Sequence, residues 1–219
     1  GPPTGKRIRF RAFADCWAMD NKIHDEWIVR DNGGLARQMG YSPEEMTRHM
    51  ISEEGGLEHA TPAFTPAIDR PGPYSGRGND NEWGQRYADI LTRIMNADMA
   101  VIEQEYDRAV TLELPGNVSA DGRGAADRFW IKLRAAFPDA EFRINHIIGR
   151  EDPHMPPRSA LRWSLHGSHD GWDAFGKPSG ANVYIMGFSH AEFGPWGLRR
   201  EWVGYDELAI WRQILMHLG

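Results

Sequence analysis

The start of the chain repeats its end. Residues 1–40 align without a gap on residues 176–215 at a constant offset of 175, and nine of the forty positions are identical. The identical pairs are Gly1/Gly176, Pro3/Pro178, Gly5/Gly180, Phe13/Phe188, Glu26/Glu201, Trp27/Trp202, Asp31/Asp206, Arg37/Arg212 and Gln38/Gln213. If an internal repeat is overlooked, the whole fold assigned to the sequence is wrong. This repeat therefore constrains the architecture of the chain more than any local pattern does. Only the final part of the unit occurs twice, which predicts one whole domain preceded by the last third of another.

Three segments follow from this repeat. Residues 1–50 are expected to form the C-terminal part of a first copy, and residues 81–219 a complete copy. Between them, residues 51–80 are rich in Gly and Pro, which predicts a linker or an arm. The large apolar residues of this segment favour an arm that lies on a surface. They are Phe64, Ile68 and Tyr74.

Local patterns give the elements of each copy. The first copy reads as strands at 6–14 and 23–31, a helix at 32–39 and a second helix opened by the capping box Ser42–Glu45. The complete copy reads as helices at 83–98 and 100–106, a strand at 110–114, a helix at 126–137, strands at 141–150, 159–168, 182–192 and 198–206, and a helix at 207–218. This order predicts an α+β fold in which a curved antiparallel sheet is packed on one face by helices.

Composition narrows the classes of partner. A net charge of −6 gives no basic surface for nucleic acid, and no apolar run is long enough to span a bilayer. The only cysteine, Cys16, cannot form an internal disulfide and favours a reducing cytoplasm. Gly-rich nucleotide loops, Cys/His metal sets and G-x-S-x-G nucleophile motifs are absent from the sequence, so an enzyme here is expected to need neither cofactor nor metal.

Four segments resemble one known family. They are the helix with N-A-D near its end (87–98), AADRFWIKLRAAFPDAEFRINHIIG (125–149), ALRWSLHGSHDG (160–171) and LRREWVGYDELAIWRQIL (198–215). Together they resemble the SnoaL-like polyketide cyclases of the nuclear-transport-factor-two-like superfamily. This resemblance implies a cone-shaped α+β domain whose apolar interior holds a small molecule, and dimers that form through the sheet. Half a cone cannot bury its own sheet. We therefore expect the rest of the first copy to come from a partner chain or a second copy, to have been cleaved off, or to be missing from the chain.

Asp206 is the first catalytic candidate. The resemblance implies that an acidic residue in this part of the last strand acts as a general acid/base, and burial would raise its pKa toward neutrality. The alternative is an N-cap of the closing helix, because Asp31 recurs at the equivalent place. Asp31 is then the corresponding candidate of the first copy, and both interpretations remain open.

Histidines supply the second group of candidates. His190 follows apolar residues on one strand face, and the resemblance implies a His–Asp pair, so His190 with Asp206 is the preferred combination. His166 and His169 fall on opposite faces of a strand, so one is expected to be structural and the other a proton shuttle. The spacing of these histidines is unsuited to a shared metal.

Residues for binding a flat, aromatic ligand are expected around these groups, although core packing or an ion pair would explain several of them equally well. They are Trp163, Trp202, Tyr184, Arg200, His146 and Phe188. The function predicted is cofactor-independent acid/base chemistry on an aromatic or polyketide-like small molecule, making or breaking a carbon–carbon bond as an aldol-type cyclase or a retro-aldol-type lyase. The alternatives are a hydratase, dehydratase or isomerase in the same cone, and a non-catalytic binding or assembly module.

Overall fold

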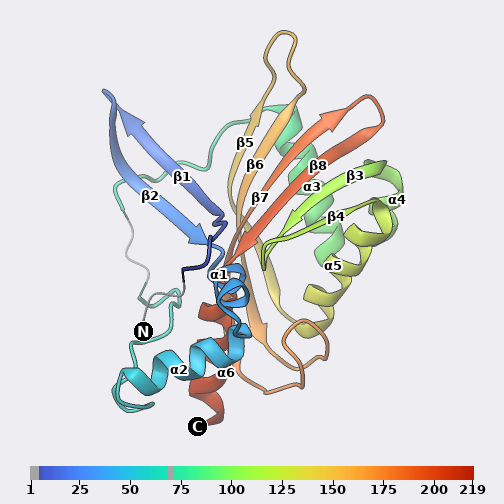
Figure 1. Ribbon diagram of the computed structural model, residues 1–219. Helices are drawn as coiled ribbons and strands as arrows, with labels where there is room; N and C mark the ends of the chain where they lie inside the picture. The colour runs from blue at the N-terminus through green and yellow to red at the C-terminus, as the bar shows by residue number, and fades with distance from the viewer. Residues whose placement is uncertain (1–4, 69–71) are drawn as a thin grey trace.

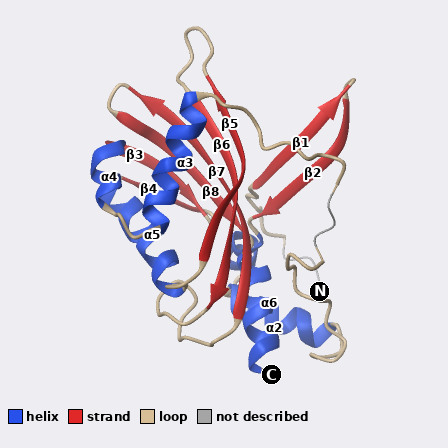
Figure 2. Ribbon diagram, turned by 180° about the vertical axis from the view of Figure 1, so that it is seen from behind, coloured by secondary structure: helices blue, strands red, loops and turns tan. Residues whose placement is uncertain are grey.

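A six-stranded sheet lies between the helices of residues 82–136 and a separate two-stranded hairpin of residues 12–30 (Figures 1 and 2). The computed structural model describes residues 5–68 and 72–219. Its elements are β1 (Ala12–Met19), β2 (Lys22–Arg30), α1 (Asn32–Met39), α2 (Pro43–Glu53), α3 (Glu82–Met95), α4 (Ala100–Glu105), β3 (Tyr106–Leu114), β4 (Val118–Asp121), α5 (Arg123–Ala136), β5 (Glu141–Arg150), β6 (Arg158–Ser168), β7 (Asn182–Gly194), β8 (Gly197–Tyr205) and α6 (Glu207–Leu218). The α+β architecture predicted from the sequence is confirmed.

The sheet runs in the order β4-β3-β8-β7-β6-β5. Its neighbours are antiparallel except β3 and β8, which pair in parallel. The sequence analysis missed β4, a strand of four residues, because a strand this short carries little periodicity. Gly116 and Asn117, both with positive φ, make the turn that brings β4 back along β3.

The main core lies between this sheet and helices α3, α4 and α5. In α3 the residues predicted at helical spacing are buried, and in α5 Trp130 and Leu133 are buried. Strand alternation supplies the opposite side of the core, with Val203 and Tyr205 of β8 pointing inward. We call the side chains between the sheet and these three helices the inner layer. This layer occupies the space that the resemblance assigns to a ligand.

The hairpin of β1 and β2 reproduces β7 and β8 in detail. Adding 175 to every pair in its register gives a pair in the β7–β8 register, and both registers are interrupted at the same point, after Trp17 and after Glu192. The equivalent residues Phe13 and Phe188 stack on each other, with ring centroids 6.4 Å apart. That residues 1–50 are the last part of a first domain stays a prediction, as do the other segment bounds. Residues 1–4 of the repeat lie outside the described residues.

The segment predicted as an arm connects the hairpin to the sheet. Phe64 packs beside Tyr184, with ring centroids 6.0 Å apart, and Tyr74 contacts Trp17 and Trp27 of the hairpin. Ile68 is exposed. Residues 69–71 of the segment lie outside the described residues. Of the helices that the structure describes, none is both long enough and apolar enough to cross a bilayer.

Candidate functional site

The inner layer of the cone is filled by side chains. Trp130, Trp163, Tyr87 and Tyr106 expose none of their surface, and neither does Glu201 between them. Four cavities among the described residues lie elsewhere, on the outer side of the sheet and around α1, α2 and α6.

Glu201, the equivalent of Glu26 in the repeat, is the buried acid of this inner layer, and it was not among the predicted site residues. The hydroxyls of Tyr87 and Tyr106 each donate to its Oε1 at 2.8 Å, and Nε1 of Trp130 donates to its Oε2 at 3.4 Å. Burial raises the pKa of Glu201 to about 7, although these three donors act in the opposite direction. Alternation with Val203 and Tyr205 was the signal that could have placed it inside.

Most of the predicted ligand-binding residues lie on the opposite, outer face of the sheet. Trp163 lies in the inner layer, where its Nε1 donates to Ser189 Oγ at 2.9 Å. The candidate residues on the outer face of β7 and β8 are Tyr184, Phe188, His190, Arg200 and Trp202. The hairpin covers part of this face, so the predicted residues are brought together between hairpin and sheet rather than inside the cone.

A chain of three polar side chains joins the hairpin, the arm and the sheet. The hydroxyl of Tyr74 lies 2.8 Å from Nε2 of His146, and Nδ1 of His146 lies 2.8 Å from Oδ2 of Asp15. An ionised carboxylate only accepts, so Nδ1 donates to Asp15, and in the neutral imidazole Nε2 then accepts from the Tyr74 hydroxyl. We call Tyr74, His146 and Asp15 the relay.

Arg162 supports the relay from the neighbouring strand. Its Nε lies 3.3 Å from Oδ2 of Asp15, and its guanidinium stacks 3.9 Å from the ring centroid of Trp27. A guanidinium held over an indole is fixed in orientation and attracted by the ring. Arg162 therefore holds Asp15 of β1 and Trp27 of β2 against the sheet.

A register irregularity turns His146 toward the hairpin. Along β5, Ile144 pairs with Trp163 but His146 pairs with Arg162, so Asn145 is an extra residue in the strand. Uninterrupted alternation would put His146 on the same face as Ile144. The bulge reverses that direction, and His146 becomes buried between sheet and hairpin.

The arm is fastened beside His146 by backbone pairing. The N–H of Ile147 donates to Arg77 at 3.0 Å, and the N–H of Asn79 donates to the Ile147 carbonyl at 2.8 Å. Between them, Gly78 has a φ of +96°, and a Cβ there would lie 1.6 Å from the same carbonyl oxygen. Only glycine fits at this close approach. On the hairpin side, the N–H of Tyr74 donates to Asp25 at 3.1 Å.

Two cavities flank the relay. The relay cavity, of about 250 Å³, is lined by Asp15, Cys16, Trp17, Trp27, Tyr74, Gly78, Asn79, His146 and Ile148. A larger cleft of about 820 Å³ opens between the N-terminal segment and the outer face of the sheet, and it contains His190. Burial lowers the pKa of His190, while the charge of Asp15 acts in the opposite direction. The aromatic walls of the relay cavity suit a flat ligand.

Asp206 caps helix α6. Its carboxylate accepts from the N–H groups of Leu208 at 2.9 Å and Ala209 at 3.4 Å, and from Nδ2 of Asn32 at 2.6 Å. Burial raises the pKa of Asp206, which these hydrogen bonds oppose. The residue lines cavities of about 180 and 410 Å³, whereas His190 lines the 820 Å³ cleft. The structure therefore does not bring His190 and Asp206 into one cavity.

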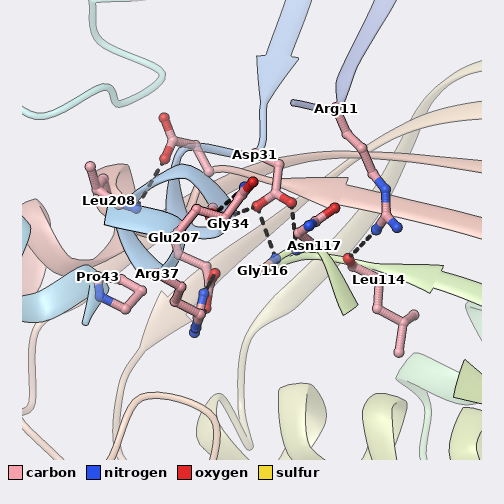
Figure 3. A network of polar contacts seen from close by, with 12 residues as sticks. Arg11, Asp31, Gly34, Arg37, Pro43, Leu114, Gly116, Asn117, Glu207 and Leu208 are labelled. Carbon is pink, nitrogen blue, oxygen red and sulfur yellow. Dashed lines mark hydrogen bonds and ion pairs between the residues drawn. The ribbon is translucent and has the colours of Figure 1, made fainter. Parts of the chain in front are cut away.

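Asp31 makes the equivalent cap for α1 and also ties α1 to the sheet (Figure 3). It accepts from the N–H groups of Gly34 at 2.9 Å, Gly116 at 2.9 Å and Asn117 at 2.7 Å. Nearby, Arg37 of α1 forms an ion pair with Glu207, the first residue of α6. Three donors on a buried carboxylate are typical of a structural role.

The two remaining histidines lie apart from the relay. His169 is buried beside Phe137 and Phe175, its Nδ1 is 3.0 Å from Ser179 Oγ, and burial lowers its pKa. His166 is exposed at the end of β6, its ring edge on Tyr184. Across residues 5–68 and 72–219, no group of three or more His, Cys, Asp or Glu side chains could hold a metal ion.

Comparisons with known proteins agree with this architecture. The family model of the SnoaL-like polyketide cyclases matches residues 83–214. A crystal structure from Jannaschia sp. CCS1, assigned to the SnoaL-like polyketide cyclases, aligns with a TM-score of 0.51 and 15% identity over 62% of this chain and 96% of its own. IdmH from Streptomyces antibioticus, assigned as a polyketide cyclase, gives 0.51 and 15% over 61% of this chain and 99% of its own. A search of curated proteins finds no match. The chain belongs to the SnoaL-like polyketide cyclase family.

Proposed function

We propose that the protein is a cofactor-independent enzyme that makes or breaks a carbon–carbon bond of an aromatic small molecule by acid/base catalysis at the relay. The observation that carries this proposal is the unbroken chain from Tyr74 through His146 to Asp15, with both contacts at 2.8 Å beside an aromatic cavity. Such a base, oriented by a third group, is the usual arrangement for moving a proton.

The relay can serve an aldol-type reaction in either direction. The Tyr74 proton passes to Nε2 of His146, and Asp15 stabilises the imidazolium that results. In cleavage, the Tyr74 oxygen takes the proton of a β-hydroxyl group, the carbon–carbon bond breaks into an aldehyde and an enolate, and the proton held on His146 returns to the enolate. In condensation, the same oxygen removes the α-proton, the enolate attacks a carbonyl, and the new alkoxide takes the proton back.

The relay also favours an enzyme over a non-catalytic binding or assembly module. A structural interface has little need of an ionisable triad beside a cavity of about 250 Å³. Hydration of a conjugated enone is the second candidate function, because the exposed Asn79 gives the relay cavity a polar wall for a water. Both functions use the same base and differ in the substrate that the cavity accepts.

We further propose that the hairpin takes the place of a second subunit. Phe13 meets its own equivalent, Phe188, as residues near the twofold axis of a symmetric dimer do. The hairpin face turned away from the sheet is exposed at Ala14, Cys16 and Ile23. A further chain segment or a partner chain that covers this face would complete the first copy.

The test is turnover of a fluorogenic naphthalene β-hydroxyketone, which releases a fluorescent naphthaldehyde and acetone, together with hydration of the corresponding enone. We expect wild-type turnover of one of them, with kcat lowered at least about 100-fold in His146→Gln and in Tyr74→Phe. His217→Gln, on the exposed end of α6, is the matched control and should be unchanged. Absence of wild-type turnover on both compounds would contradict the proposal, as would equal losses in His146→Gln and His217→Gln.

A further inference from the structure

The 820 Å³ cleft is surrounded by arginine. Arg9 and Arg11 come from the N-terminal segment, Arg150 and Arg158 from β5 and β6, and Arg200 from β8. Two carboxylates, Glu113 and Glu192, also line it. The protein as a whole carries a net charge of −6, so this gathering of cations opposes the overall charge.

The two glutamates of the cleft are already neutralised. Glu113 pairs with Arg11, and Glu192 pairs with Arg199 at 3.0 Å. In the part of the chain that the structure describes, one other carboxylate pairs with these arginines: Asp152 is shared by Arg150 and Arg158, each of which approaches it at 2.7 Å. The arginines in and beside the cleft therefore outnumber the three carboxylates paired with them, and the cleft carries a net positive charge.

Three arginine groups in the cleft have unused hydrogen-bonding capacity. Within residues 5–68 and 72–219, the side chains of Arg9 and Arg200 form no ion pair, and the buried Nε–H of Arg158 has no acceptor. A guanidinium presents fixed, parallel donors that fit the two oxygens of a carboxylate or the oxygens of a phosphate. The donors are thus placed for an oxyanion from outside the chain.

Apolar side chains form the rest of the cleft. Phe13, Trp202, Phe10 and Ile148 line it, and the last two are exposed. A volume of about 820 Å³ falls in the range of sites for drug-sized molecules. Because burial lowers the pKa of His190, this histidine is neutral near pH 7 and adds a polar contact without charge.

We propose that this cleft binds an amphipathic organic anion, in which a carboxylate or phosphate contacts the arginines and an apolar body lies on Phe13 and Trp202. The cleft shares Ile148 with the relay cavity. The proposal deepens the proposed function by assigning a charged end to the substrate of the relay, but its test needs no turnover.

The experiment is calorimetric titration with naphthoate, naphthyl phosphate and the neutral naphthamide. We expect at least one of the two anions to bind at least tenfold more tightly than naphthamide, and the preferred anion identifies the natural oxyanion. Arg200→Gln and Arg9→Gln should each weaken that binding about fivefold or more. Arg48→Gln removes the same charge from the exposed side of α2 and should leave binding unchanged.

Three outcomes would overturn this inference. They are naphthamide binding as tightly as both anions, equal weakening in Arg48→Gln and Arg200→Gln, and failure of both anions to bind. If the anions fail to bind while His146→Gln still abolishes turnover, the inference is wrong and the proposed function stands. If the anions bind and turnover is absent, the cleft is a binding site and the relay is not catalytic.

Discussion

Glu201 allows a quantitative test of the packed inner layer. Its carboxyl is fully buried among Tyr87, Tyr106 and Trp130, and its pKa is about 7 against an ordinary value of 4.5. Between these values the folded chain keeps a proton that the unfolded chain has released. The wild-type protein therefore loses stability as pH rises from about 4.5 to 7, and the difference between the two pKa values corresponds to about 3 kcal/mol.

Glu201→Gln should remove this dependence on pH. Glutamine has the shape of the protonated acid, and its amide oxygen can accept both tyrosine hydroxyls that Glu201 Oε1 now accepts at 2.8 Å. Its amide nitrogen cannot accept from Trp130, so the variant gives up only the longest of the three bonds, at 3.4 Å, and this loss does not depend on pH. The variant should therefore gain stability over the wild type with rising pH, by less than about 1 kcal/mol near pH 5 and by about 3 kcal/mol near pH 8. Urea unfolding followed by tryptophan fluorescence measures this difference. Glu53→Gln, on the exposed side of α2, is the control. A difference that stays constant between pH 5 and pH 8 would refute the reasoning.

Three further changes test the placement of the site. Gly78→Ala should destabilise the docking of the arm by about 1–3 kcal/mol, measured as faster proteolysis near Tyr74. Gly56→Ala, at a similar φ of +89° but with open space around it, should destabilise the protein less. Equal effects of the two substitutions would exclude the clash with Ile147. Asp206→Ala should lower the free energy of unfolding by about 1–2 kcal/mol through loss of the cap and leave turnover intact, and loss of turnover in a stable variant would restore Asp206 as a catalytic residue. Phe13→Ala should weaken hairpin docking by about 3 kcal/mol, measured as faster amide exchange in β1 and β2, and unchanged exchange would show that the stack on Phe188 does not hold the hairpin.

The elements that depend on local pattern were predictable from the sequence. The 3.6-residue period of α3 and the alternation of β7 and β8 come from burial on one face, and both patterns are written in the sequence. The strand predicted at residues 23–31 and the helix predicted at 32–39 agree with the observed β2 and α1, but the strand predicted at 6–14 was wrong in its bounds, because β1 runs from Ala12 to Met19. The four-residue β4 is too short to show a period, and the parallel pairing of β3 with β8 joins distant parts of the chain, which leaves no local pattern.

The candidate site depended on features that periodicity does not carry. The bulge at Asn145 reverses the direction of His146, and a single inserted residue has no sequence signature of its own. Tyr74 reaches the site through an arm whose course depends on the close approach at Gly78. His146 was predicted as a ligand-binding residue, but its partners Asp15 and Tyr74 lie 131 and 72 residues away in the chain. Only the folded chain brings these three residues together.

The most direct test of the account compares the turnover of His146→Gln and Glu201→Gln in the same assay near pH 6.5. At this pH both variants are expected to be folded, so a loss of turnover reports on the relay or on the inner layer and not on unfolding. The account predicts that His146→Gln lowers kcat at least about 100-fold, while Glu201→Gln keeps wild-type kcat within about twofold. The opposite pattern, with turnover lost in Glu201→Gln and retained in His146→Gln, would place the chemistry inside the cone and contradict the relay.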